Sequence, residues 1–190
     1  MAMKLVLIGL RGTGKSTIGR LLAERLRWRF FDTDSLVQER AGMTIKEIFA
    51  RHGEPHFRRV EAAVVQECAG HNDAVIATGG GAILDPANVD ALRSGGFVVH
   101  LTAPPSELWR RIARDQASPA NRPQLVQGAA DGVDELQQLM LARAAAYARA
   151  RDVEVSVEGR SPPEVAEAIA ILMRARGALK EEAAGGRAGT

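Results

Sequence analysis

The sequence has a single cysteine, Cys68, among its 190 residues. One thiol excludes an intramolecular disulfide and a metal cluster built from thiolates, so a reducing compartment suits the chain. We expect Cys68 to be buried on a helix as a small apolar residue. The sequence also lacks any run of about 20 apolar residues, the length that a transmembrane helix needs. The apolar segment at 5–8 leads directly into a glycine-rich loop without a signal-type cleavage region, so we expect a soluble cytoplasmic protein.

Net charge is small as well, because 25 basic residues stand against 23 acidic residues and leave a formal charge of +2. This balance argues against a surface that coats nucleic acid, so we expect small-molecule partners and neither nucleic acid nor membrane. The length suits one domain, which we assign to residues 1–176, and a hydrophobic content of 46% is enough for a substantial core. Residues 177–190 are rich in Ala, Gly and charge and are predicted to be disordered.

Short apolar runs alternate with amphipathic segments along the chain. Strands are predicted at 5–8, 29–31, 74–77, 97–101 and 153–157. Apolar residues spaced three and four apart predict helices that include 18–26 and 57–68. Because parallel strands need helical crossovers, this alternation predicts a three-layer α/β fold with a parallel sheet.

Helix-start signals agree with this assignment. Thr44 with Glu47 and Ser161 with Glu164 have the spacing of capping boxes, while Pro55 and Pro162 suit a first helical turn.

The stretch GLRGTGKST, residues 9–17, fits the phosphate-binding pattern GxxxxGK[ST] between a predicted strand and a predicted helix. Backbone N–H groups of the loop and the start of the helix would bind phosphate oxygens. Lys15 would reach the outer phosphates, and the hydroxyl of Ser16 would bind Mg²⁺. A chance glycine turn is the alternative. We therefore expect a nucleoside triphosphate with magnesium.

The fate of the phosphate depends on other segments. No NKxD tetrapeptide is present, which weighs against a GTPase switch. A small-molecule kinase needs an acceptor pocket and a mobile segment that excludes water. The polar, Pro- and Gly-containing stretch at 115–132 is long for a connection within a domain and is predicted to be such a lid.

Three short stretches offer groups for an acceptor. In FFDTD, Asp32 and Asp34 follow a strand and so lie at the ligand-binding edge of a parallel sheet, although Asp34 could instead cap the next helix. In GEPHFRRVE, Arg58 and Arg59 could bind an anion or be solvated surface charges. In TGGG, residues 78–81, bare backbone permits close approach of a ligand, and a plain tight turn is the alternative.

In this order and spacing, GLRGTGKST, DTD, GExxFRxxE and TGGG resemble the shikimate kinase family over roughly residues 3–175. The resemblance implies a P-loop kinase domain with five parallel strands in the order 2-3-1-4-5, a substrate-binding segment at about 33–61 and a lid at about 115–132. It also implies a monomer that transfers the γ-phosphate of ATP, with Mg²⁺, to the 3-hydroxyl of shikimate. A kinase of gluconate or a nucleoside monophosphate, and a binding homologue without catalysis, stay open as alternatives.

The resemblance implies roles for individual residues. Asp34 would be the base toward the 3-hydroxyl, and Asp32 with Ser16 would hold Mg²⁺. Arg58 and Arg143 would bind the shikimate carboxylate, which a planar guanidinium matches with two parallel hydrogen bonds. The remaining substrate-binding residues would be Phe49, Phe57, Gly79, Gly80 and Gly81. Nucleotide binding would involve Gly12, Thr13, Gly14, Lys15, Ser16, Thr17, Arg111, Arg122, Arg160 and Pro162, and the catalytic residues would be Lys15, Asp34 and Arg122.

Two positions depart from the family pattern. The lid reads Arg-Pro-Gln-Leu at 122–125, where the family often has Arg-Pro-Leu-Leu. After Arg143, Ala145 stands where the family commonly has proline, although Tyr147 is kept. The helix register there is open, and Arg149 or Arg151 is the alternative to Arg143.

Overall fold

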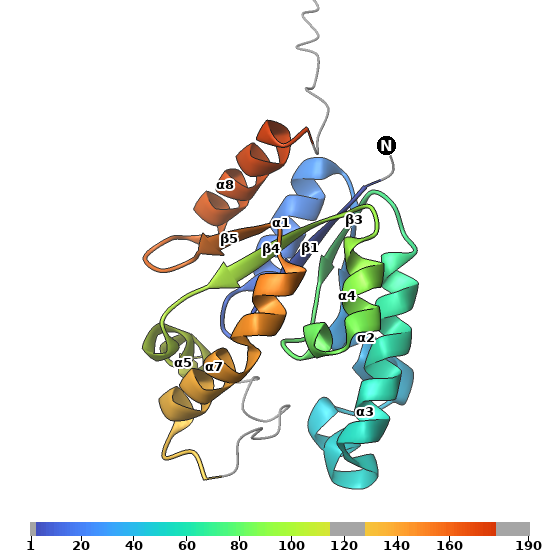
Figure 1. The fold of residues 1–190 in the computed structure, drawn as a ribbon, viewed down its shortest axis with the longest axis vertical. Coiled ribbons are helices and arrows are strands. Elements are labelled where there is room, and N and C mark those ends of the chain that lie inside the picture. Colours follow the sequence, from blue (N-terminus) through green and yellow to red (C-terminus); the bar gives the residue numbers. More distant parts are fainter. Residues whose placement is uncertain (1–2, 115–127, 178–190) are drawn as a thin grey trace, which may run out of the picture.

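The sheet of the protein confirms the predicted topology. The computed structural model describes residues 3–114 and 128–177 (Figure 1). Five strands, all parallel to their neighbours, follow the order β2-β3-β1-β4-β5. They are β1 (Lys4–Ile8), β2 (Arg29–Asp32), β3 (Ala74–Ala77), β4 (Gly96–Thr102) and β5 (Val153–Ser156). Each observed strand matches its predicted range to within one residue at either end.

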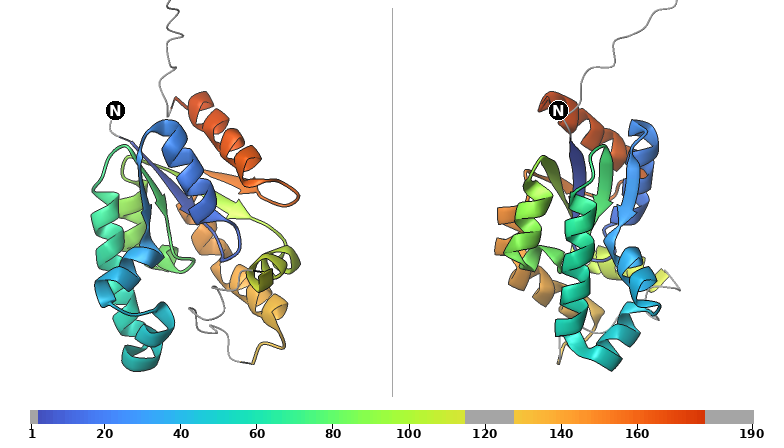
Figure 2. Two further views of the ribbon diagram at one scale, coloured as in Figure 1. Left: turned by 180° about the vertical axis from the view of Figure 1, so that it is seen from behind. Right: turned by 90° about the vertical axis from the view of Figure 1, so that its right-hand side faces the viewer.

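Helices cover both faces of this sheet, as Figure 2 shows, with α1 and α8 on one face and α4 and α7 on the other. The helices described are α1 (Lys15–Leu26), α2 (Thr33–Ala41), α3 (Ile45–Ala69), α4 (Pro86–Arg93), α5 (Pro105–Arg114), α7 (Gly132–Ala150) and α8 (Pro162–Ala175), with a short 3₁₀ helix at Ala82–Leu84. Among the described residues, no helix has both the length and the apolar composition that crossing a membrane requires.

The core lies where the central strands meet the helices. Every residue of β1 and of β3 is buried, as expected for strands of a parallel sheet that is covered on both faces. Cys68 is buried on α3, which confirms its predicted position. On α8, Val165, Ile169 and Met173 recur at helical spacing and are at most 1% exposed.

Helix α3 is interrupted at Gly53, whose φ of 76° and ψ of 170° are not helical. Pro55 therefore stands in the first turn after the break, as its sequence position predicted, and its missing N–H costs little there. The predicted capping box is present at the beginning of the helix, where the hydroxyl of Thr44 accepts a hydrogen bond from the backbone N–H of Glu47. The break brings the rings of Phe49 and Phe57 together, with centroids 4.8 Å apart.

Candidate functional site

The glycine loop joins the buried strand β1 to helix α1. Gly14 precedes the helix in the left-handed conformation, with a φ of 84°. A Cβ on Gly9 would lie 2.5 Å from the carbonyl oxygen of Leu101, so the loop packs too closely on β4 for a side chain. The ammonium of Lys15 donates hydrogen bonds to the carbonyls of Gly9 at 2.8 Å and Leu10 at 2.9 Å. A phosphate bound in the loop would compete with these carbonyls for the lysine.

A pocket opens in front of this loop and brings together most of the predicted nucleotide-binding and metal-binding residues. Those that line it are Gly12, Gly14, Lys15, Ser16, Thr17, Asp32, Arg111, Arg160 and Pro162. Thr13 does not line it: its side chain is buried, and its hydroxyl donates to the carbonyl of Leu10 at 2.8 Å. We refer to this cavity as the nucleotide pocket.

Within the nucleotide pocket, Ser16 and Asp32 form an oxygen pair suited to a hard cation. The Ser16 hydroxyl donates to Oδ2 of Asp32 at 2.5 Å. Among the described residues there is no cluster of three or more His, Cys, Asp or Glu side chains that could hold a metal ion alone. This donor set fits Mg²⁺, which usually takes one or two protein oxygens together with phosphates and water.

The structure also separates the roles of Asp32 and Asp34. Oδ1 of Asp32 accepts a hydrogen bond from the backbone N–H of Ser35 at 3.2 Å, and Asp32 is the N-cap of α2. Asp34 lies inside the first turn of that helix. The alternative in which Asp34 serves only as the helix cap is therefore wrong.

A second pocket adjoins the first and brings together all the predicted substrate-binding residues. Its lining includes Asp34, Phe49, Phe57, Arg58, Gly79, Gly80, Gly81 and Arg143. We refer to this cavity as the acceptor pocket. Asp34 and Arg11 line both pockets, so they stand where a transferred group would pass from one to the other.

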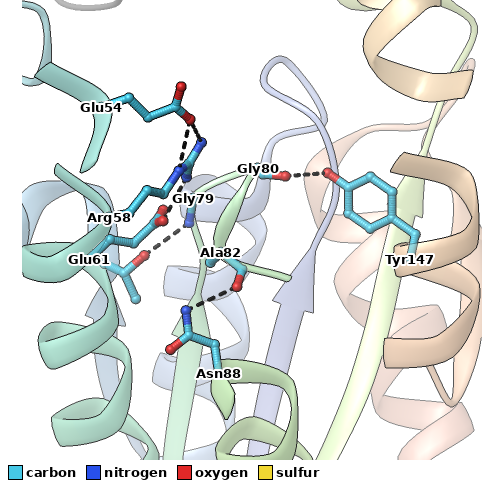
Figure 3. Close-up of polar contacts among 9 residues, drawn as sticks. Glu54, Arg58, Glu61, Gly79, Gly80, Ala82, Asn88 and Tyr147 are labelled. Carbon is cyan, nitrogen blue, oxygen red and sulfur yellow. Dashed lines mark hydrogen bonds and ion pairs between the residues drawn. The ribbon is translucent and has the colours of Figure 1, made fainter. Parts of the chain in front are cut away.

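Arg58 belongs to a charge network with one exposed carboxylate, Glu54, and one buried carboxylate, Glu61 (Figure 3). Its guanidinium contacts Glu61 at 2.7 Å and Glu54 at 2.9 Å. Arg59 is exposed, so the solvated alternative fits Arg59 and not Arg58. Burial tends to lower the pKa of Arg58, but the carboxylates of Glu61 and Glu54 outweigh this effect and raise it.

Glu61 is a site residue to which the sequence assigned no role. Its side chain is only 2% exposed, and it lies three residues after Arg58 on the same face of α3. Burial raises the pKa of Glu61, while the guanidinium of Arg58 opposes the rise. The carboxylate of Asp34 raises the pKa of Glu61 further, and Arg143 lowers it. The last Glu of the GExxFRxxE pattern was the signal that could have identified it.

The TGGG segment is held from two sides, so it is more than a plain turn (Figure 3). The backbone N–H of Gly79 donates to the hydroxyl of Thr33 at 2.9 Å. From α7, the hydroxyl of Tyr147 donates to the carbonyl of Gly80 at 2.8 Å. A Cβ on Gly79 would lie 2.5 Å from a carboxylate oxygen of Asp34. Bare backbone at this position therefore lets an acidic side chain approach the pocket wall.

Arg143 lies in an unbroken helix α7, so Ala145 does not disturb the register with Tyr147. Its side chain reaches the acceptor pocket although the residue is only 7% exposed. Arg149 is exposed, and Arg151 forms an ion pair with Glu154; neither lines the acceptor pocket. The geometry therefore favours Arg143 over both alternatives.

Some predictions fall on residues outside the described part of the chain. These are Arg122, the lid residues 115–127 and the tail residues 178–190. Of the predicted lid, Asp131 caps α7 by accepting a hydrogen bond from the backbone N–H of Asp134 at 2.9 Å.

Comparison with known proteins identifies relatives over most of the chain. Residues 11–174 match the family profile described as shikimate kinase. A shikimate kinase of Symbiobacterium thermophilum is 46% identical over 175 residues, which cover 92% of this chain and 98% of that protein.

Solved structures agree with this similarity. The shikimate kinase from Acinetobacter baumannii in complex with shikimate superposes with a TM-score of 0.85 and 32% identity, covering 93% of this chain and 95% of that one. A gluconokinase from Sinorhizobium meliloti has a TM-score of 0.61 and 20% identity, covering 93% of this chain and 95% of that one, and shares the fold.

Proposed function

Because the chain belongs to the shikimate kinase family, it is an ATP-dependent kinase that phosphorylates a hydroxyl of shikimate, and we propose that the acceptor is the 3-hydroxyl. The products are then shikimate 3-phosphate and ADP, in a step of aromatic amino-acid biosynthesis. The observation that carries this proposal is the pair of adjoining pockets, which share Asp34 and separate the nucleotide residues from the acceptor residues.

In the acceptor pocket, Arg58 and Arg143 bind the shikimate carboxylate. The place of both residues in the acceptor pocket and the burial of Arg143 support this assignment, because a guanidinium shielded from water forms a strong charge-assisted pair with a carboxylate. The backbone of Gly79, Gly80 and Gly81 contacts the ring hydroxyls, while Phe49 and Phe57 form the apolar wall.

Phosphoryl transfer then proceeds at the boundary of the two pockets. Asp34 accepts the proton of the 3-hydroxyl as the bond from oxygen to the γ-phosphorus forms and the bond to the ADP oxygen breaks. Lys15 neutralises charge on the outer phosphates. When bound by Ser16 and Asp32, Mg²⁺ supplies positive charge to the phosphates. Arg111, Arg160 and Pro162 bind the adenine, and their place in the nucleotide pocket supports that role.

Arg122 stays a prediction for the transferring phosphate. Arg122→Ala is expected to lower turnover far more than shikimate affinity, because an arginine that closes over the phosphate acts only in the transition state. Equal losses in kcat and in affinity would contradict that role.

We propose further that residues 1–176 form one domain, with a substrate-binding segment at 33–61 and a lid at 115–132. The protein acts as a cytoplasmic monomer on small molecules, without nucleic acid or membrane.

The test is a coupled assay for ADP release with ATP and Mg²⁺, run in parallel with shikimate, gluconate, AMP and no acceptor. Release with shikimate alone, with ³¹P NMR placing the phosphate on the 3-hydroxyl, is the expected result. Release with gluconate or AMP would assign the acceptor pocket to another ligand. No release with any acceptor would favour a binding homologue.

A further inference from the structure

Arg11 is a charged residue of the glycine loop that the pattern GxxxxGK[ST] does not require. Its side chain lines both the nucleotide pocket and the acceptor pocket. Only 14% of that side chain is exposed, so its charge is largely shielded from water. Within the described part of the chain, its Nε is one of two buried side-chain polar atoms that have no hydrogen-bond partner.

A carboxylate from a distant helix balances this charge. Nη2 of Arg11 forms an ion pair with Glu135, whose side chain is 5% exposed and which lies in the first turn of α7. The two residues are 124 positions apart, so the pair ties the phosphate loop to the helix that also carries Arg143. Glu135 pairs with one end of the Arg11 guanidinium. The Nε–H of Arg11 has no hydrogen-bond acceptor among the residues that the structure describes.

We propose that Arg11 is a further catalytic residue, a cation within the phosphate loop that contacts the γ-phosphoryl group as it passes to the acceptor. A guanidinium that lines both pockets and has a donor that the described part of the fold leaves unused is suited to charge that grows on the equatorial phosphate oxygens. The hydroxyl proton goes to Asp34 and the leaving group is ADP, so Arg11 acts without forming or breaking a covalent bond. Glu135 positions the guanidinium. This inference rests on the proposed function.

The experiment compares kcat, both KM values and melting temperature for the wild type, Arg11→Met, Arg11→Lys and Glu135→Gln. We expect Arg11→Met to lower kcat about 100-fold, the effect typical of removing one transition-state donor, with small changes in KM. Arg11→Lys should retain part of the activity because it keeps the charge. Glu135→Gln should lower kcat much less than Arg11→Met, because the guanidinium is still present.

Chemical rescue separates catalysis from stability. Activity of Arg11→Ala should increase several-fold when guanidinium is added at millimolar concentration. The matched control is Arg25→Ala, which breaks the ion pair of Arg25 with Glu167 between α1 and α8 and lines neither pocket. Its activity should match the wild type and not respond to guanidinium.

Two outcomes would overturn the role of Arg11. One is a kcat for Arg11→Met within twofold of the wild type. The other is equal losses in Arg11→Met and Glu135→Gln without rescue, which would indicate an ion pair that only stabilises the fold. If the wild type itself releases no ADP with shikimate, the proposed function fails first and this inference fails with it.

Discussion

At the scale of single residues, the acceptor pocket brings two arginines close to two carboxylates. Arg58 and Arg143 line this pocket together with Asp34 and Glu61. Burial raises the pKa of Glu61, and the charge of Arg58 opposes the rise. Removing one member of such a network leaves a shielded charge without its partner, which costs more than the pair itself contributes. Substitutions here are therefore expected to lower the free energy of unfolding as well as ligand affinity, and the melting temperature of each variant separates the two effects.

Arg58→Ala is expected to raise the dissociation constant for shikimate by about 100-fold, which corresponds to about 2.7 kcal/mol for a lost partner of a shielded charge. The KM for ATP should stay within threefold, because Arg58 does not line the nucleotide pocket. Isothermal titration calorimetry measures the first value and steady-state kinetics the second. Arg59→Ala, at the exposed neighbour, is the control, and a normal shikimate affinity in Arg58→Ala would refute carboxylate binding.

His100 is a buried residue that should make stability depend on pH. Burial lowers its pKa to about 4, while the carboxylate of Glu154 opposes this shift. In the unfolded chain its pKa returns to about 6.5, so between these values the unfolded state binds a proton that the folded state does not. The free energy of unfolding should therefore fall as pH drops from 6.5 toward 4, by about 2 kcal/mol at most after solvent screening.

Denaturant unfolding of the wild type and His100→Gln across this pH range checks the effect. The advantage of the wild type over His100→Gln in free energy of unfolding should decrease as pH falls, because only the wild type has the histidine. A constant difference across the range would mean that His100 does not titrate as described.

At the scale of elements, hydrogen bonds from two different helices hold the TGGG segment in place. Thr33 at the start of α2 accepts from Gly79, and Tyr147 on α7 donates to Gly80. The ring of Tyr147 also stacks on His100, with centroids 4.3 Å apart and planes 9° apart. Helix α7 thus places Arg143 in the acceptor pocket and fixes the glycine backbone of the same pocket.

Tyr147→Phe is expected to raise the KM for shikimate about tenfold, since the carbonyl of Gly80 loses its donor at a cost of about 1–3 kcal/mol. The KM for ATP should not change. Asp85→Ala is a suitable control, because it removes the N-cap of α4 at a cost of about 1 kcal/mol and lies outside both pockets. Equal kinetic effects in the two variants would show that lost stability alone explains the result.

At the scale of the whole molecule, the two pockets lie at one edge of the sheet and share Arg11 and Asp34. Parallel strands direct their carboxyl ends to the same edge, which is where ligands bind in such folds. Ligands in adjoining pockets stabilise the whole folded chain, because the unfolded chain binds neither of them.

MgADP at 100 times its dissociation constant should stabilise the protein by about 2.7 kcal/mol. For a chain of this size, that corresponds to a rise in melting temperature of about 5–10 °C. Asp32→Asn should reduce the part of this shift that requires Mg²⁺, and differential scanning fluorimetry with and without EDTA measures it. An unchanged response to EDTA in Asp32→Asn would remove Asp32 from the magnesium site.

The amino-acid sequence by itself determined the strands, the phosphate loop and part of both pockets, whereas Phe49, Arg143 and Arg111 entered only through the family resemblance. These features depend on local patterns: apolar runs for β1 and β3, glycine spacing at 9–14, and a charged residue beside a core residue at Arg58 and Phe57. The strand order and the roles came from the resemblance, and the observed sheet agrees with that order.

Only the tertiary structure decided which distant side chains complete the site. Thr33 contacts Gly79 across 46 positions, Tyr147 contacts Gly80 across 67, and Arg11 contacts Glu135 across 124. Such pairs have no local pattern, because they form only when the sheet order brings their elements together. Asp32 caps α2, so capping by Asp34, the alternative that the sequence left open, is wrong: the position at which a helix begins depends on the backbone that precedes it.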